Sequence, residues 1–446
     1  MSFLYQLEEV VEAISFYMWG KELIIFIIFV GLVGTMLFNF TQVKYFFTGW
    51  KLLFSQSSNK SSYNKDAISP IQAFINALSA SLGNGGLAGM AIVLVDGGPG
   101  AAFWVFMLGF FNMIIRFFEV YAGLKFSENT LIGPLGYIKN MPFGKLFCYL
   151  YAFIMFIYII FGGIGMQTNS IGLSIHKTFG ISNYLIGLGF VCLITYIIFG
   201  GSERIMKASE YIIPVKVVLF FVGIIALLIY HYHMIIPSLL LVIKSAFNTK
   251  AAVSGIGIFT MQKAICSGVP KALNATEAGV GTASIFFSAS DSKNALKSAV
   301  MSMLSAFIST NLVCAMLIFS IVVSGISTDG LTSTAVIIKA FETILGSLAG
   351  PAITFLSFSF GLGVMVAYIF LGYKVWQFLF GNRMLAVYYG LLIFISFFGA
   401  IASVGLIWKS LDTLVGLLII INLLALLWNG KKLREEFLKD QKQLSL

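Results

Sequence analysis

The chain has 446 residues, of which 59% are hydrophobic and only 10% are charged, and its mean hydropathy is +0.95. Soluble domains carry about 25% charged residues, so this composition excludes a soluble protein and predicts an all-α, polytopic membrane protein. The formal net charge of +10 lies in short loops between apolar segments. We therefore interpret it as a determinant of membrane orientation and not as a nucleic-acid surface.

Two segments precede the main body of the chain. Residues 23–66 are expected to form an extra first span, at 23–42, followed by a lysine-bearing inner loop. Before them, residues 1–22 predict an amphipathic helix on the outer membrane surface, with an apolar face made by Leu4, Leu7, Val11 and Ile14.

The first five-helix repeat, expected over residues 67–232, begins with an apolar segment that glycines interrupt. Four glycines fall within residues 83–89, and each costs a helix about 1 kcal/mol relative to alanine. A break of this kind is tolerated in a membrane only where the freed backbone groups face protein, water or a ligand. The segment predicts an unwound binding site with Asn84 beside it, and close helix packing through glycine is the alternative.

Further spans of this repeat are expected at residues 101–126, 147–174, 183–199 and 211–230. Arg116 and Glu119 are one helical turn apart and predict a structural ion pair. Gln167 lies in a segment that is polar for a membrane helix. Its amide predicts either substrate binding or a hydrogen bond between helices.

The second repeat, expected over residues 233–430, begins with another broken span at 253–287. Its break contains Glu277, and a lone carboxylate in lipid costs at least roughly 2.5 kcal/mol. Three roles are open for Glu277: binding a cation, carrying a proton, or accepting backbone N–H groups from the half-helices. We expect the other spans at 295–323, 349–379, 385–407 and 411–428, outer helices at 235–250 and 332–348, and a charged, solvated tail at 431–446.

Lysine and arginine are distributed unevenly between the two sides of this eleven-span arrangement. With the N-terminus outside and the C-terminus in the cytoplasm, the inner loops carry a roughly threefold excess of these residues, as the positive-inside rule requires. Each repeat has an odd number of spans, so the second would enter the membrane from the side opposite to the first. The sequence assigns no partner to Lys216, Lys263 and Lys271, which lie within spans.

Motifs for enzymatic chemistry are missing from the sequence. It contains no G-x-S-x-G elbow, no H-E-x-x-H and no phosphate-binding loop, so we expect a protein that is not an enzyme and that moves solutes by an ion gradient or passively. His231 and His233 have no evident third ligand, and no metal site is expected. Nothing in the sequence indicates nucleic-acid binding or an obligate protein partner; membrane lipid is the expected surroundings.

Several motifs, in order from about residue 68 to residue 427, resemble those of the alanine or glycine:cation symporter family, also called the sodium:alanine symporters. The resemblance is carried by Ile68-Ser69-Pro70-Ile71-Gln72-Ala73, Gly97-Gly98-Pro99-Gly100-Ala101 with Phe103-Trp104, Arg116-Phe117-Phe118-Glu119, Gln167-Thr168-Asn169-Ser170, Glu277-Ala278-Gly279-Val280-Gly281 and Phe378-Leu379-Phe380-Gly381.

The resemblance implies a leucine-transporter-like fold, a 5+5 inverted repeat with two broken helices preceded by one extra helix. It implies uptake of small neutral amino acids, alanine or glycine, with Na⁺ or H⁺ as the coupling ion and no other cofactor, in a bacterial inner membrane. Implied substrate-binding residues are Gly83, Asn84, Gly85, Gly86, Gln167, Thr276, Gly279 and Tyr368. Implied cation-binding residues are Leu82, Gly83, Glu277 and Thr282.

The sequence departs from the family pattern at the expected site. The family's first break usually reads G-T-G-N, but here it is Gly83-Asn84-Gly85-Gly86, and Thr276 replaces the Asn before the Glu of the second break. In the ninth span, Val364 replaces an oxygen-bearing threonine and Tyr368 replaces a tryptophan. Two alternatives therefore stay open: an uncoupled transporter or exchanger of a different small substrate on the same fold, and a non-transporting membrane sensor.

Overall fold

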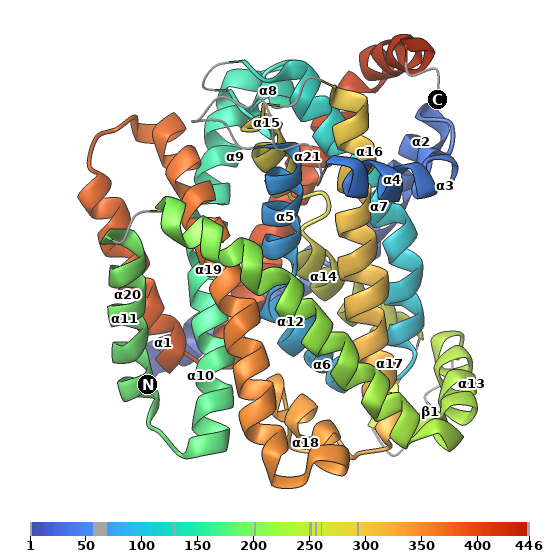
Figure 1. Ribbon diagram of the computed structural model, residues 1–446, viewed down its shortest axis with the longest axis vertical. Helices are drawn as coiled ribbons and strands as arrows, with labels where there is room; N and C mark the ends of the chain where they lie inside the picture. Colours follow the sequence, from blue (N-terminus) through green and yellow to red (C-terminus); the bar gives the residue numbers. More distant parts are fainter. Residues whose placement is uncertain are drawn as a thin grey trace.

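The computed structural model describes residues 2–56, 69–128, 131–199, 202–248, 252–254, 257–259, 261–291 and 294–443. Helices make up nearly all of this part, with one two-stranded hairpin (Figure 1). The elements α4, α8 and the end of α21 lie at one end of the molecule, and α13, α18 and the hairpin lie at the other.

The chain begins with α1 (Ser2–Met18) and α2 (Lys21–Leu37), and the direction of the chain bends by 46° between them. The predicted N-terminal helix is present and packs against α21; its first apolar side chains, through residue 8, lie outside the described part. Two short helices follow, α3 (Thr41–Lys44) and α4 (Phe46–Gln56). They occupy the first part of the predicted inner loop, which is therefore partly helical, and residues 57–68 lie outside the described residues.

The first broken span consists of α5 (Pro70–Ser81) and α6 (Asn84–Gly97). A capping box starts α5: Gln72 N donates to Ser69 Oγ at 3.2 Å, and Ser69 N donates to Gln72 Oε1 at 3.0 Å. The span is interrupted as predicted, but only Leu82 and Gly83 are not helical. Gly85, Gly86 and Gly89, which the sequence predicted as part of the unwound segment, belong to α6, because glycine also serves close helix packing.

The rest of the first half contains α7 (Ala101–Phe126), α8 (Pro134–Ile138), α9 (Gly144–Tyr158), a π-helical segment η1 (Ile159–Gly165), α10 (Met166–Phe179), α11 (Asn183–Phe199) and α12 (Ser202–Tyr230). The segment η1 interrupts the predicted fourth span where three of its seven residues are glycine. Such π-turns are frequent at functional sites.

The second half starts with η2 (Tyr232–Met234) and α13 (Ile235–Ala246), followed by an antiparallel hairpin of β1 (Ala252–Ser254) and β2 (Gly257–Phe259). The hairpin corrects the predicted start of the seventh span, because residue 253 lies in a strand and does not begin a helix. β-Branched residues and glycines alternate here, which suits a tight hairpin better than a helix. The other elements of the described fold are helical, as predicted. The broken span itself is α14 (Met261–Thr276) and α15 (Thr282–Ser288).

The chain continues through α16 (Ala295–Phe307), the π-helical η3 (Ile308–Ala315), α17 (Met316–Ser324), α18 (Thr334–Leu345), η4 (Gly346–Leu348), α19 (Ala349–Phe380), α20 (Leu385–Ile401) and α21 (Val404–Gln443). The predicted tenth span was too long, because α20 ends at Ile401 and α21 already begins at Val404.

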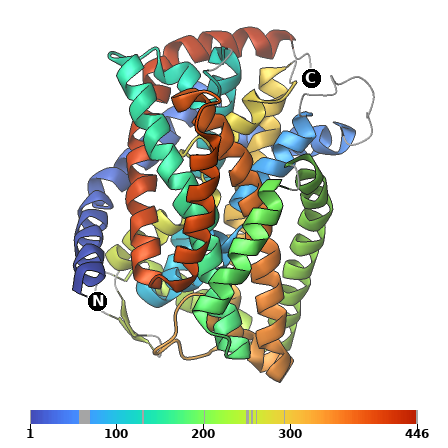
Figure 2. The ribbon, with the colours of Figure 1, turned by 90° about the vertical axis from the view of Figure 1, so that its left-hand side faces the viewer.

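The predicted solvated tail is wrong. Helix α21 continues through it to Gln443, and Figure 2 shows this last part running across one end of the molecule. Leu433 and Phe437 are fully buried, and Asp440 forms an ion pair with Lys125 at 2.9 Å. Apolar residues at helical spacing among the charges dock the tail on the end of α7.

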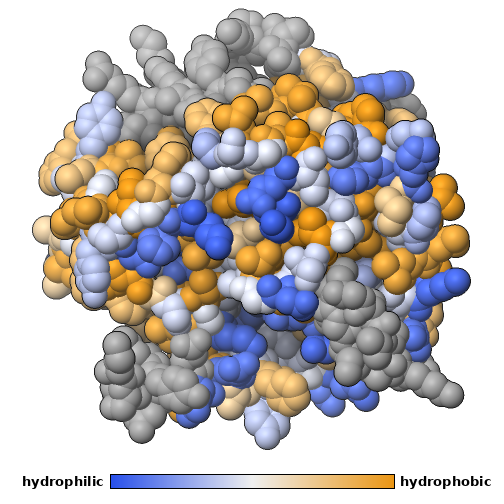
Figure 3. All heavy atoms as spheres, turned by 90° about the horizontal axis from the view of Figure 1, so that it is seen from below, coloured by the Kyte–Doolittle hydropathy of each residue, from blue (hydrophilic) through white to orange (hydrophobic). Residues whose placement is uncertain are grey.

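Several helices are long and apolar enough to cross a membrane. By length and composition there are six in the described residues, or up to eight if the bent pairs α1–α2 and α12–α13 each count as one span; α11 and α20 are shorter apolar helices. Figure 3 views the end that carries α13 and α18, where hydrophilic residues gather across the face and apolar residues lie toward its upper edge and sides.

The two broken spans run in opposite directions through the molecule (Figure 1). Helix α6 packs against α14, and α5 packs against α15. The two breaks therefore lie at a similar depth, in the interior of the bundle.

Candidate functional site

The two breaks adjoin each other. A β-carbon placed on Gly85 would lie only 3.1 Å from Cα of Ala275, so the first turn of α6 contacts the last turn of α14 almost backbone to backbone. Asn84 and Thr276 are fully buried. A site here is enclosed by protein on all sides.

At the first break, the side chain of Gln167 on α10 binds the buried N-terminus of α6. Asn84 donates to Gln167 Oε1 through its backbone N at 3.0 Å and through Nδ2 at 3.1 Å. Gln167 Nε2 donates in turn to the Gly162 carbonyl, 3.2 Å away in η1. A neutral amide thus fills the acceptor position at the N-terminus of a half-helix, where an anionic group is favoured.

Asn84 also ties the break to α19. Its Nδ2 donates to the Ser357 carbonyl at 3.1 Å, and Ser357 Oγ donates to Asn84 Oδ1 at 2.7 Å. Of the two roles that the sequence left open for Gln167, the hydrogen bond between helices is present here, and Asn84 makes such bonds too.

Close packing accounts for a further part of the glycine pattern. A β-carbon on Gly83 would lie 2.5 Å from Cγ2 of Val364 and 3.1 Å from Nε2 of Gln167. The glycine allows α19 and α10 to approach the break closely. The two explanations of the glycine-rich stretch, an interruption and a tight crossing, therefore both apply.

The second break is a turn of residues with positive φ. Glu277, Gly279 and Gly281 have φ values of 56°, 81° and 89°, in the left-handed region that favours glycine. Val280 N donates to the Glu277 carbonyl at 3.1 Å and closes the turn. Glu277 has a β-carbon and bears some strain there, so the surrounding bonds must hold it.

The predicted ion pair is confirmed and lies at this break. Arg116 Nη1 and Glu119 Oε1 are 3.2 Å apart, and both side chains are fully buried. Arg116 Nη2 donates to the Thr276 carbonyl at the end of α14, where a cation offsets the helix dipole. Gly279 N donates to Glu119 Oε2 at 3.1 Å. The ion pair therefore forms hydrogen bonds to the backbone both before and within the turn.

The carboxylate of Glu277 accepts hydrogen bonds from hydroxyl groups. Thr282 Oγ1, on the first residue of α15, donates to Oε2 at 2.5 Å, and the Tyr368 hydroxyl of α19 donates to Oε1. Of the three roles that the sequence left open for Glu277, accepting backbone N–H groups is not the one seen here, because Glu119 accepts the N–H of Gly279. Two predicted residues, Thr282 of α15 and Tyr368 of α19, therefore come together around this one carboxylate.

Sequence reasoning missed several groups that complete the second break. Their types gave a signal, since each is a polar residue in an apolar span, but spacing along the chain does not show which break a side chain reaches. The bonds run from Asn112 Nδ2 to Thr276 Oγ1 at 3.1 Å, from Asn422 Nδ2 to the Gly279 carbonyl at 2.8 Å, and from the Tyr151 hydroxyl to the Val280 carbonyl. The Tyr158 hydroxyl lies 3.0 Å from the Tyr368 oxygen and donates to it, because the one hydrogen of the Tyr368 hydroxyl is donated to Glu277.

The structure also gives the partners of two lysines among the three that the sequence left unassigned. Lys271 of α14 forms a buried ion pair with Asp412 of α21 and lies 5.7 Å from the ring of Trp408. Lys216 of α12 donates to the Leu82 carbonyl at the first break, at 3.1 Å.

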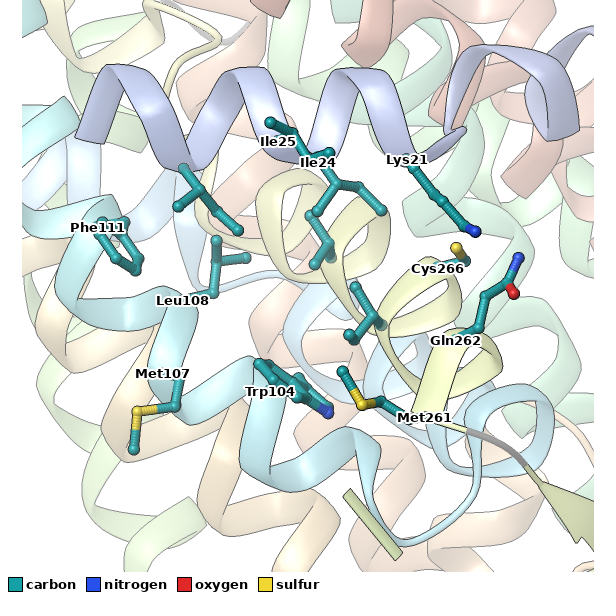
Figure 4. Close-up of a pocket in the computed structure, with 13 residues that line it drawn as sticks. Lys21, Ile24, Ile25, Trp104, Met107, Leu108, Phe111, Met261, Gln262 and Cys266 are labelled. Carbon is teal, nitrogen blue, oxygen red and sulfur yellow. The ribbon is translucent and has the colours of Figure 1, made fainter. Parts of the chain in front are cut away.

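A cavity of about 640 Å³ lies elsewhere, between α2, α7 and the first turns of α14. Figure 4 shows apolar side chains from these three helices around it, with Lys21 and Gln262 near one end. No residue of either break lines this cavity, so it is separate from the site described above.

Discontinuous helices whose half-helix ends meet in the interior are a feature of secondary transporters. Comparison with known proteins gives the particular family. The sequence pattern of the sodium:alanine symporter family matches residues 4–444, and the chain belongs to this family. The resemblance seen in its motifs is thereby confirmed, and the family is one of sodium-coupled membrane transporters and not of enzymes.

Individual relatives match over most of their length. The chain is 29% identical to the sodium/alanine symporter AgcS of Methanococcus maripaludis, covering 94% of this chain and 93% of the relative. It is 28% identical to the probable sodium/glutamine symporter GlnT of Bacillus subtilis, covering 94% and 88%. Among solved structures it is similar to a manganese transporter of Eremococcus coleocola, with 13% identity, a TM-score of 0.41 and coverage of 82% and 74%.

Proposed function

We propose that the protein is a secondary active transporter that takes up small neutral amino acids, alanine or glycine, together with Na⁺ or H⁺ by alternating access. The observation that carries this proposal is the contact between two buried helix breaks, at Gly85 and Ala275, from which half-helix ends point inward. Such ends bind the charged groups of a zwitterion, an anion at a helix N-terminus and a cation at a C-terminus.

The proposed substrate site lies between the breaks. Neighbouring helices approach the backbone closely at Gly83 and Gly85, which favours a small ligand beside these residues and Gly86. The amides of Asn84 and Gln167 would exchange their present bonds for a substrate carboxylate at the start of α6. On the opposite side the site is completed by Thr276, Gly279 and Tyr368.

The proposed cation ligands also come from both breaks. At the second break, Glu277 supplies a carboxylate and Thr282 a hydroxyl, and these hard oxygens suit Na⁺; a proton on Glu277 is the alternative. At the first break, the candidates are the backbone carbonyls of Leu82 and Gly83.

We propose the predicted topology of eleven spans, with a first repeat at 67–232 and an inverted second repeat at 233–430. The proposed count takes the six long helices, two bent pairs and two shorter apolar helices together with α14–α15 as one span each. The packing of α6 on α14 and of α5 on α15 supports the inversion. The segments 1–22 and 23–66 precede the repeats, and 431–446 follows them in the cytoplasm, with the N-terminus outside a bacterial inner membrane.

A second candidate is an uncoupled transporter or exchanger of another small substrate. It is favoured by Val364, whose methyl group faces Gly83 and offers no oxygen to a cation. One such substrate would be an amino acid with a side-chain amide, since a relative is named as a probable sodium/glutamine symporter.

The experiment that tests these proposals is uptake of radiolabelled L-alanine into proteoliposomes, with and without an inward Na⁺ gradient. Symport predicts accumulation above equilibrium that requires a Na⁺ or H⁺ gradient and is competed by glycine but not by D-alanine. Equilibration without accumulation, unaffected by either gradient, would establish the uncoupled alternative. Uptake no greater than that of protein-free liposomes for alanine, glycine and glutamine would contradict both.

A further inference from the structure

A buried ammonium group lies at the carboxyl end of α5. Lys216 is 1% exposed, and its Nζ lies 3.1 Å from the carbonyl of Leu82, the residue that follows the last turn of α5. The ring of Phe360 on α19 is on another side, with its centroid 5.0 Å from Nζ. Among the described residues, no carboxylate forms an ion pair with Lys216.

The surroundings of Nζ are crowded and polar on the α5 side. A β-carbon on Gly363 would lie 2.8 Å from Lys216 Nζ and 2.7 Å from Ser79 Oγ. Both groups therefore pack against the backbone of α19 at a position that has no side chain. Ser79 Oγ is buried and has no hydrogen-bond partner in the described part of the chain. The end of α5 thus presents a carbonyl and an uncommitted hydroxyl to one cationic atom.

The C-terminus of α14, the other half-helix that ends in the interior, is also bound by a cationic side chain. Arg116 donates to the Thr276 carbonyl at the end of α14, just as Lys216 donates to Leu82 at the end of α5. Arg116, however, is neutralised by Glu119. Because a charge inside a membrane is costly without a partner, the dipole end of α5 and the Phe360 ring must provide most of the stabilisation of Lys216.

A half-helix C-terminus with unwound carbonyls is also where transporters hold their coupling cation. We propose that the Lys216 ammonium is the built-in cation of the first break. It occupies the place beside Leu82 where a free cation would bind, so this break takes up no Na⁺, and the coupling cation binds at the second break with Glu277. The inference rests on the proposed function for the role of α5 in transport, and it narrows the cation ligands proposed above to those of the second break.

The test is the Na⁺ dependence of thermal stability, measured on the full-length purified protein without amino acid. The quantity compared is the rise in melting temperature when choline chloride is replaced by NaCl. In Lys216→Met/Val364→Thr the ammonium is removed and a hydroxyl is supplied beside Gly83, so we expect a larger Na⁺-dependent rise than in the wild type. Val364→Thr alone should respond to Na⁺ as the wild type does, because Lys216 still fills the position.

Two outcomes would overturn the proposal. One is an equal Na⁺ response in the wild type and the double variant; the other is a gain of Na⁺ response, or of ²²Na⁺ binding, in Val364→Thr alone. The second comparison remains decisive if Lys216→Met does not fold. Lys374→Met is the matched control, because Lys374 also lies over a phenylalanine ring, 5.6 Å from the centroid of Phe370, and its removal should leave the Na⁺ response unchanged.

Uptake assays separate this inference from the function on which it rests. If the wild type accumulates alanine, Lys216→Met should lower the initial rate at least tenfold, whereas Lys374→Met should not, and a Lys216→Met protein with the wild-type rate would overturn the inference alone. If the wild type transports no amino acid, the proposed function fails. The melting temperatures then still show whether Lys216 excludes Na⁺ from the first break.

Discussion

At the first break, neutral amides and one lone ammonium bind the ends of the half-helices, whereas at the second break an ion pair and a carboxylate do so. Gln167 and Asn84 satisfy the start of α6 without any formal charge. Arg116, Glu119 and Glu277 surround the turn between α14 and α15. The unpaired backbone groups at the ends of the half-helices are therefore stabilised by mostly neutral groups at one break and by charged groups at the other.

The difference indicates how the two breaks divide their roles. Amide hydrogen bonds can be exchanged for those of a substrate at modest cost, since a typical bond contributes only about 0.5–1.5 kcal/mol net. A buried ion pair is far harder to disrupt. We infer that the hydrogen bonds of the first break rearrange around a substrate, and that the second break is more rigid and holds Glu277 in position.

The largest expected effect follows from breaking the ion pair at the second break. Arg116→Met leaves Glu119 buried without a counter-charge and should lower the free energy of unfolding by about 3–5 kcal/mol, measured by unfolding in SDS. The double variant Arg116→Met/Glu119→Gln should recover part of this loss. Lys339→Met is the control, because the exposed pair of Lys339 with Glu342 contributes only about 0–1 kcal/mol. If Arg116→Met and Lys339→Met lowered the free energy of unfolding equally, the ion pair at the second break would not be the rigid element inferred here.

The next effect tests whether Glu277 acts with its hydroxyl donors. Tyr368→Phe removes a hydrogen bond to a carboxylate, a loss of about 1.5–3 kcal/mol, so alanine binding in the presence of Na⁺ should weaken about tenfold or more. Equilibrium binding of radiolabelled alanine measures this. Tyr388→Phe loses a bond to the Ile369 carbonyl, 2.8 Å long and away from the breaks, and a similar weakening there would assign the effect to general stability.

A smaller effect tests the close packing of the first break. In Gly83→Ala the added methyl group would lie 2.5 Å from Val364 Cγ2, and such overpacking typically costs about 1–3 kcal/mol. The backbone at Gly83, with φ of −110°, accepts alanine without strain, so Val364→Ala should restore stability to the double variant. Gly189→Ala on α11, where nothing lies within 4 Å, should be neutral or slightly stabilising. Failure of the rescue would mean that Gly83 is needed for its backbone.

The smallest expected effect distinguishes a hydroxyl from a methyl group at the second break. Thr282→Ser keeps the donor to Glu277 and removes one buried methyl group, so stability should fall by about 0.8 kcal/mol with alanine binding unchanged. Thr282→Val keeps the shape and removes the donor, and it should weaken Na⁺-dependent alanine binding. If the two variants bind alanine equally well, Thr282 has no part in the cation site.

The sequence by itself determined the class of protein, the positions of both breaks and the pairing of Arg116 with Glu119. These features depend on composition and on neighbours within one helix, where a separation of three residues places two side chains on the same face. The glycine-rich stretches locate each interruption approximately, since the conformational preference of glycine is local, although Gly85, Gly86 and Gly89 are helical in α6.

Only the tertiary structure decided which groups meet at each break. That Gln167 reaches Asn84, that Lys216 reaches Leu82 and that Tyr368 reaches Glu277 depends on how α10, α12 and α19 cross the broken spans. Spacing along the chain carries no information about such crossings, because a polar residue in an apolar helix has the same local signature wherever its partner lies. The docking of the C-terminal part of α21, predicted as solvated, was decided by the same kind of contact between distant segments.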